Sequence, residues 1–121
     1  MISPVKILSD LLTREGNAIM YAKVVTFTIK PGERDEVIRL FQDFVVPGAR
    51  KHMGFKGGLL LTDPNTGKGT SIGLWETQGD IEASETSGYY REWVAKLGVH
   101  FSEKPARHIY EVSNLVNLSL K

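Results

Sequence analysis

The stretch GGLLLTDPNTGKGTSIGLWETQGDIEASETSGYY, from Gly57 to Tyr90, decides the fold of this chain. Its pattern predicts a strand over Gly57–Thr62, a turn over Asp63–Gly69 and a second strand over Thr70–Glu76. The turn begins with Asp-Pro-Asn and ends with two glycines, which either fix φ or tolerate positive φ. We therefore expect the two strands to pair as a hairpin.

Each side of this hairpin carries one further helix and one further strand. Before it we expect a strand over Tyr21–Ile29 and a helix over Asp35–His52, and after it a helix over about Gly79–Phe101 and a strand over Ala106–Val116. The order is β-α-β-β-α-β. This order predicts an α+β, ferredoxin-like domain, with a four-stranded antiparallel sheet and both helices on one face.

Three local signals refine the two predicted helices. Pro47 removes a backbone donor and clashes with the preceding turn, so we expect a kink or an early end near Val46. Thr77 and Asp80 form a pair that resembles a capping box, so the second helix should start at Thr77. Gly88 should then bend or break that helix.

The predicted strands carry apolar side chains on both faces. In the hairpin, Phe55, Leu59 and Leu61 should share one face, while Leu60 lies on the other. One layer of helices covers only one face of an antiparallel sheet, so the second apolar face needs another cover. We expect this cover to be a second copy of the chain, which makes the protein a homodimer through its sheet faces.

Composition limits the classes of function. The 121 residues include 41% hydrophobic residues, and 15 basic residues balance 14 acidic ones, so no charge excess indicates nucleic acid or a membrane as partner. The chain has no cysteine, which excludes disulfides, thiolate metal sites and a Cys nucleophile, and fits a cytoplasmic protein. Its apolar runs are too short to span a bilayer.

We divide the chain into residues 1–19, 20–116 and 117–121. The middle part is the domain described above, and the last part is a short tail. In the first part, Ser3 and Pro4 can start a short helix whose apolar stripe ends near Gly16, and no signal peptide is expected. Met20 is an alternative start of the protein, which would make residues 1–19 an accessory arm.

Four phrases carry a resemblance to a known family: YAKVVTFTIKPGERDEV at 21–37, VVPGARKHMGFKGGLLL at 45–61, GLWET at 73–77 and SGYYREW at 87–93. With this order of elements, the chain from Met20 to about Val116 resembles the antibiotic biosynthesis monooxygenase domain family. The resemblance implies a dimeric α+β barrel in which two sheets close face to face. Activities in the family include cofactor-independent oxygenation of polyketide-like phenols and quinols, haem degradation and an isomerase reaction.

The haem-degrading branch is disfavoured. Its members have an Asn on the first strand and a Trp followed by a His on the second helix. The stretch Tyr21–Ile29 contains no Asn, and Trp93 and His100 are two helical turns apart. The resemblance therefore favours a monooxygenase without cofactors that acts on a small aromatic quinol or phenol. The alternative is a dimer of the same fold that binds a small molecule, or serves as an accessory subunit, without catalysis.

We expect a pocket between the sheet and the second helix, where Gly88 opens space. His100 is the candidate base and Tyr90 the candidate orienting donor, because imidazole and phenol groups can exchange protons with a phenolic ligand. Three more aromatic residues are candidates for substrate binding by stacking: Tyr89, Trp93 and Phe101.

Simpler roles remain open for the same residues. His100 can be an ordinary histidine at a helix end, and aromatic residues at helical spacing can fill the core between helix and sheet. His52, His100 and His108 fall on different elements and lack carboxylates at ligand spacing, so no metal site is predicted.

Overall fold

A computed structural model of the chain describes residues 20–116. The predictions made for residues 1–19 and 117–121 lie outside the described residues. The strands are β1 (Tyr21–Thr28), β2 (Phe55–Thr62), β3 (Lys68–Trp75) and β4 (Ala106–Glu111). The helical segments are α2 (Arg34–Leu40), the π-helical turn η1 (Phe41–Val45), α3 (Val46–Arg50), α4 (Gln78–Thr86) and α5 (Tyr89–Gly98).

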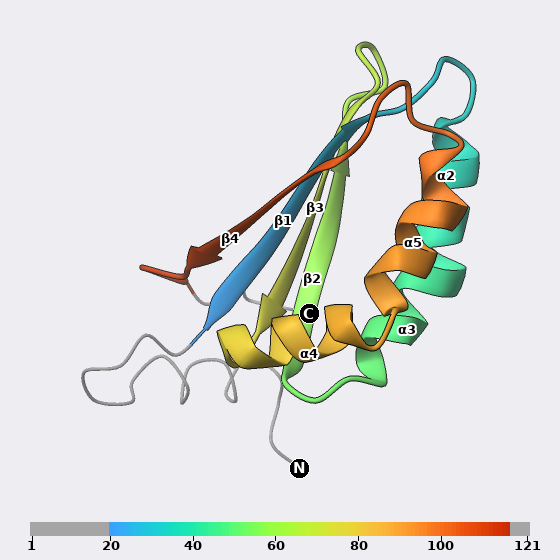
Figure 1. The fold of residues 1–121 in the computed structure, drawn as a ribbon. Helices are drawn as coiled ribbons and strands as arrows, with labels where there is room; N and C mark the ends of the chain where they lie inside the picture. Colours follow the sequence, from blue (N-terminus) through green and yellow to red (C-terminus); the bar gives the residue numbers. More distant parts are fainter. Residues whose placement is uncertain (1–19, 117–121) are drawn as a thin grey trace.

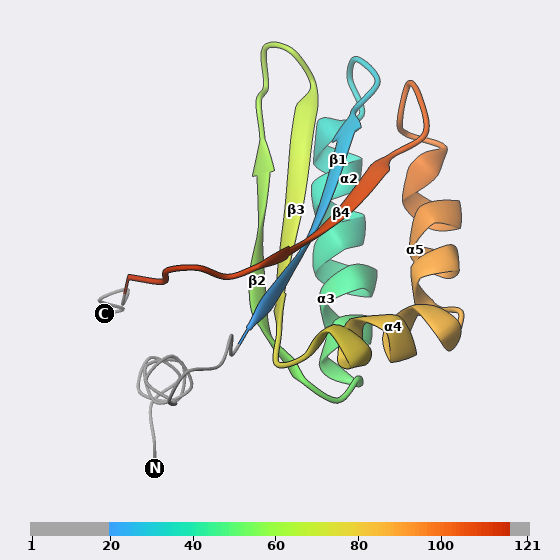
Figure 2. The same cartoon turned by 60° about the vertical axis from the view of Figure 1, so that its left-hand side comes forward.

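The four strands form one antiparallel sheet in the order β2-β3-β1-β4. All helices of the described part of the chain lie on one side of this sheet, and α5 runs beside the α2–α3 helix (Figures 1 and 2). This arrangement confirms the predicted ferredoxin-like α+β fold. The hairpin that joins β2 and β3 confirms the predicted turn, in which the Asp63 carboxylate accepts a hydrogen bond from the N–H of Asn65 at 2.8 Å.

A β-bulge at the start of β2 changes which face one aromatic residue occupies. The register shifts just after Phe55, so Lys56 is an extra residue that has no partner in β3. Such an insertion reverses the alternation of side chains on the bulged strand. The ring of Phe55 therefore packs against Trp75, with 5.2 Å between ring centroids. The prediction that Phe55 shares a face with Leu59 and Leu61 is wrong for this reason.

The first helix accommodates Pro47 without ending. A π-helical turn, Phe41–Val45, lies directly before the proline, and the N–H of Val46 bonds to the carbonyl of Phe41. Pro47 cannot donate a hydrogen bond and crowds the preceding turn, so a wider turn is a physical response to it. The irregularity predicted near Val46 is thus a widened turn, and the helix continues to Arg50.

The second helix is divided as the sequence predicts. Thr77 caps α4, because its hydroxyl oxygen accepts a hydrogen bond from the N–H of Asp80 at 3.0 Å. Gly88 adopts a φ of 94°, a conformation that costs little only for glycine, and α5 starts at the next residue. The two helices then diverge, with α4 crossing one end of the sheet (Figure 2).

The main core lies between the sheet and the helices. It consists of Val25, Phe27, Ile29, Val37, Val45, Trp93, Leu97 and Phe101. The closing strand is shorter than predicted, because β4 pairs only with β1, and the last pair joins Glu111 to Tyr21, where β1 begins. The predicted extension of this strand to Val116 is therefore wrong.

The opposite face of the sheet is also apolar, and no described helix covers it (Figure 1). One row across it runs from His108 through Val24 and Ile72 to Leu59. Tyr110 and Leu59 on this face are 56% and 45% exposed. Large exposed apolar patches of this kind mark interaction surfaces.

Candidate functional site

A cavity of about 230 Å³ lies between the sheet and the helical layer. Its walls are mostly apolar, with five aromatic rings from both layers and a few polar side chains. The rings are those of Phe41, Phe55, Trp75, Tyr89 and Trp93, and the polar lining residues are Lys23, Arg50 and Ser71. Concave, largely apolar sites with a few polar groups are typical binding sites for small molecules.

Two strand glycines, Gly73 and Gly58, form part of the floor of the cavity. Lys23, Gly73 and Gly58 lie side by side in one row across β1, β3 and β2. A Cβ added to Gly73 would come within 3.1 Å of the indole Nε1 of Trp75. A Cβ at Gly58 would instead clash with the carbonyl oxygen of Ile72, so this glycine allows a close backbone approach, and Gly73 leaves the recess toward the aromatic rings.

The helical wall is fastened by Tyr89, the first residue of α5. Its hydroxyl donates a hydrogen bond to the carbonyl of Val45, at the end of the π-helical turn. Burial raises the pKa of the Tyr89 phenol well above its usual range, although a backbone hydrogen bond to Ala49 opposes that shift. Tyr89 is thus a neutral phenol whose hydroxyl hydrogen is already used in the hydrogen bond to the carbonyl of Val45.

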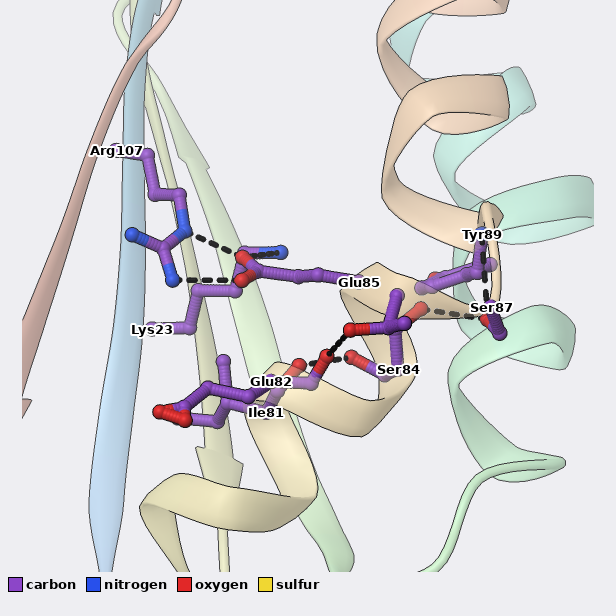
Figure 3. Close-up of polar contacts among 9 residues, drawn as sticks. Lys23, Ile81, Glu82, Ser84, Glu85, Ser87, Tyr89 and Arg107 are labelled. Carbon is purple, nitrogen blue, oxygen red and sulfur yellow. Dashed lines mark hydrogen bonds and ion pairs between the residues drawn. The ribbon is translucent and has the colours of Figure 1, made fainter.

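Lys23, on the cavity floor, belongs to a cluster of three charged side chains whose other two members lie outside the cavity lining. The ammonium of Lys23 lies 2.9 Å from a carboxylate oxygen of Glu85, on α4. The guanidinium of Arg107, on β4, forms two hydrogen bonds with the same carboxylate, one of them at 2.7 Å (Figure 3). Burial by itself raises the pKa of Glu85, but the hydrogen bonds from Arg107 and Lys23 hold it below its ordinary value.

Lys23 is the most buried charge in this cluster, with an exposed fraction of 8%. Burial lowers the pKa of its ammonium, and the hydrogen bond to Glu85 reverses this only in part. The ammonium also lies 3.5 Å from the centroid of the Tyr90 ring, a cation–π contact. Burial raises the pKa of the Tyr90 phenol, which keeps this ring neutral.

The predicted site residues divide into two groups. Tyr89 and Trp93 line the cavity, and Tyr90 contacts Lys23 and Trp93 without lining it. Phe101 stacks on Phe27 in the main core, with 4.5 Å between ring centroids, so the core role left open for it is the one that its contacts support.

His100 lies near the other end of the domain. Its Nδ1 is 2.6 Å from an oxygen of Glu33, and its carbonyl accepts a hydrogen bond from the N–H of Lys30 at 2.8 Å. Its side chain is not part of the cavity lining. The structure therefore does not bring His100 together with Tyr89 and Trp93.

Sequence reasoning missed the polar residues of the floor. Lys23 occupies the same face of β1 as Val25, Phe27 and Ile29, so a charge in an otherwise apolar row was a signal that could have been used. Ser71 is buried and lines the cavity. Nothing in the sequence distinguishes this serine from an ordinary strand residue.

Residues 20–116 contain no group of three His, Asp or Glu side chains that could hold a metal ion. The same residues contain no helix long and apolar enough to cross a membrane. The features that remain to define the site are the aromatic cavity and the charged cluster to which Lys23 belongs.

The model of the antibiotic biosynthesis monooxygenase family matches residues 20–96, which include both cavity walls. The chain belongs to the antibiotic biosynthesis monooxygenase family. This finding confirms the resemblance carried by the four sequence phrases. No curated protein matches the chain closely enough in sequence to identify a nearer relative.

Solved structures share the fold at low sequence identity. A monooxygenase from the gene ActVA-Orf6 of Streptomyces coelicolor, in complex with nanaomycin D, is 15% identical, with a TM-score of 0.71 over 84% of this chain and 95% of that one. A conserved protein from Methanosarcina mazei is 16% identical, with a TM-score of 0.67 over 78% of this chain and 93% of that one. At such identities the likeness establishes the fold alone.

Proposed function

We propose that this protein is a cofactor-independent monooxygenase that acts on a small aromatic quinol or polyketide-like phenol. The observation that carries the proposal is the hollow cavity, which five aromatic rings surround and Gly73 helps to keep open. A cavity that the protein filled with its own side chains would have favoured a role without a ligand. Membership of the monooxygenase family supports the reaction class.

The size of the cavity suggests the size of the substrate. A buried apolar cavity of about 150 Å³ is enough to bind benzene. The cavity described here has about 230 Å³, roughly half as much again, which suits two fused rings. Trp75 and Trp93 provide flat surfaces against which such rings can stack.

The reaction needs no external reductant. A phenol reacts with O₂ to give a quinone and water: one oxygen atom forms the new carbonyl, and the other leaves as water with two hydrogen atoms of the substrate. All electrons for the reduction of O₂ come from the ring, so the protein has to desolvate, orient and ionise the phenol. The sequence-based roles of His100 as base and Tyr90 as orienting donor stay predictions, and the mutagenesis described below tests His100.

We also propose that the protein works as a homodimer through its sheet faces. The support is the apolar outer face, with Leu59, Leu61 and Tyr110 each about half exposed in the single chain. A second copy would bury these side chains and close a barrel. The lack of cysteine is compatible with the cytoplasm as the place of action.

A dimer that binds an aromatic molecule without oxidising it is the second candidate, because it needs the same cavity. The two candidates differ in oxygen consumption. We would incubate the protein with two-ring quinols and with anthrone-like phenols, without added metal, flavin or haem, and follow dissolved O₂ and the quinone product. Consumption above the autoxidation rate, with one atom of O₂ found in each quinone product and no H₂O₂ released, supports the monooxygenase. Binding without consumption favours the second candidate.

A matched pair of variants ties any activity to the cavity. Trp93→Leu removes one stacking surface, whereas Val99→Ala changes an exposed apolar residue at the end of the same helix, outside both the cavity lining and the outer sheet face. If the cavity is the site, the first variant should lower kcat/KM at least about tenfold and the second should leave it near the natural value. Equal rates in both would exclude the cavity as the site of reaction.

A further inference from the structure

The charged residues that line the cavity are all cationic. Lys23 and Arg50 line it, and no Asp or Glu does. The whole chain is nearly balanced, with 15 basic and 14 acidic residues, so this one-sided lining does not reflect composition. Arg50 forms no ion pair with any described residue.

The cluster behind the floor leaves its cavity-lining member incompletely neutralised. One carboxylate, that of Glu85, faces two cations, those of Lys23 and Arg107 (Figure 3). Arg107 donates two hydrogen bonds to this carboxylate, and the ammonium of Lys23 makes a single contact with it. Counted by themselves, Lys23, Glu85 and Arg107 carry a net charge of about one positive unit at neutral pH, and Glu82 adds a carboxylate that acts on Arg107 without forming an ion pair with it.

We propose that the cavity binds its aromatic ligand as an anion, a carboxylate or a phenolate, whose oxygen faces the ammonium of Lys23. This inference rests on the proposed function in one respect, that an aromatic ligand enters the cavity. The inference goes beyond the proposed function in two respects: it specifies the charge of the ligand, and it names Lys23 as the residue that recognises this charge. No base is then needed inside the cavity, because the phenolate form is selected directly and its proton is left in the solvent.

The energetics of Lys23 support this assignment. An ammonium has three donors, and the two partners found for it among the described residues are the Glu85 carboxylate and the Tyr90 ring face. Its lowered pKa reports that burial is compensated only in part. An anion in the adjoining apolar cavity would supply a charge-assisted hydrogen bond in a medium of low dielectric constant, where such bonds are strong.

Two ligands of the same shape test the charge. We would titrate the full chain with 2-naphthoate, which is ionised at pH 7, and with 2-naphthamide, which is neutral, using calorimetry for affinity. Both tryptophans of the chain line the cavity, so their fluorescence reports occupancy at this place. A third titration uses 2-naphthol, whose phenolate absorbs at longer wavelength than the phenol, and so separates a phenolate ligand from a carboxylate one.

Two variants should change the affinity for naphthoate in opposite directions. Lys23→Met keeps the apolar stem and removes the charge, and Glu85 retains its two hydrogen bonds to Arg107, so no carboxylate is left unpaired. Naphthoate should bind at least about tenfold more weakly to this variant, with naphthamide unchanged. Glu85→Gln removes the competing anion and should tighten naphthoate binding severalfold. Damage to the fold would weaken binding in both variants.

Lys56→Met is the matched control, because Lys56 pairs with Glu76 and does not line the cavity. The proposal is overturned if naphthoate and naphthamide bind equally, or if Lys23→Met leaves their ratio unchanged. In that case an aromatic ligand still binds, and the proposed function survives. If no ligand changes the tryptophan fluorescence or gives binding heat, both proposals fail. A shift of 2-naphthol to its phenolate form on binding, lost in Lys23→Met, identifies the phenolate as the preferred anion.

Discussion

The imidazole Nδ1 of His100 lies 2.6 Å from the carboxylate Oε1 of Glu33, and this contact joins the segment that follows α5 to the loop before α2. Two further hydrogen bonds strengthen the same junction: the backbone N–H of Lys30 donates to the carbonyl of His100, and the ammonium of Lys30 donates to the carbonyl of Val99. His100 thus fastens two helices at one end of the domain, while the cavity lies between the sheet and the start of α5.

This position leads to a prediction for His100→Ala. The variant should be less stable by about 1 kcal/mol, because it loses one partly exposed charged hydrogen bond. Its affinity for 2-naphthoate and its rate with any quinol that the natural protein oxidises should stay within about twofold of the natural values. Denaturant unfolding and oxygen consumption measure the two effects.

Glu33→Gln is the matched control, because it weakens the same contact and keeps the imidazole. If His100→Ala loses its activity while folded and Glu33→Gln keeps it, the result supports the role of His100 as a base, which the sequence predicts. Loss of stability alone in both variants supports the role as a fastener.

The proposed dimer predicts a specific effect of charge on the outer sheet face. Leu59 is 45% exposed in the single chain and lies opposite Ile72. Leu59→Asp should leave the single chain folded, since water still reaches the side chain, but a carboxylate buried in the dimer costs several kcal/mol. The dimer dissociation constant should rise at least about 100-fold, which light scattering across a dilution series detects.

Val99→Asp provides the comparison, because Val99 is 63% exposed at the end of α5 on the helical side. It should leave the oligomeric state unchanged. A natural protein that is a monomer at micromolar concentration, or a Leu59→Asp variant that dimerises normally, would contradict the proposed interface.

Acid should weaken the link between α4 and the sheet. The pKa of Glu85 lies below its ordinary value of 4.5, with burial opposed by the hydrogen bonds from Arg107 and Lys23. A carboxylate of this kind stabilises the fold above its unfolded-state pKa, and the stabilisation is lost as the pH falls through the folded-state value. Between pH 7 and pH 3.5 the natural protein should lose about 1 kcal/mol more stability than Glu85→Gln, as measured by urea unfolding at both pH values. Equal losses would show that Glu85 does not contribute to this dependence.

The fold could be predicted because its signals are local. The hairpin turn at Asp63, the cap at Thr77 and the break at Gly88 each rest on side chains within a few residues, and all three occur in the structure. The position of Phe55 could not be predicted, because the bulge after it is set by pairing with β3. A single inserted residue moves an aromatic ring from one face of the sheet to the other.

The cavity was predicted only in part for a related reason. Tyr89 and Trp93 belong to the helix that sequence periodicity identifies, so their place on its inner face follows from the pattern. The floor depends on the alignment of Lys23, Gly73 and Gly58 across three strands. These residues are far apart in the chain, and their register cannot be derived from the spacing within any one strand.

The open space beside Gly73 in the cavity floor leads to a prediction about ligand affinity. Gly73→Ala places a methyl group 3.1 Å from the indole nitrogen of Trp75, and Gly73→Val adds two further carbon atoms to the recess. Alanine and valine both fit an extended strand better than glycine does, so the variants should fold with stability within about 1 kcal/mol of the natural protein. We expect the affinity for 2-naphthoate to fall severalfold with alanine and at least about tenfold with valine, because each added carbon removes space that the ligand needs.

Gly98→Ala is the matched control, since its added Cβ lies 3.8 Å from Val94, an ordinary contact outside the cavity. Calorimetric titration of the three variants checks the order. An affinity that is unchanged in Gly73→Val would mean that the ligand does not occupy the floor beside Lys23.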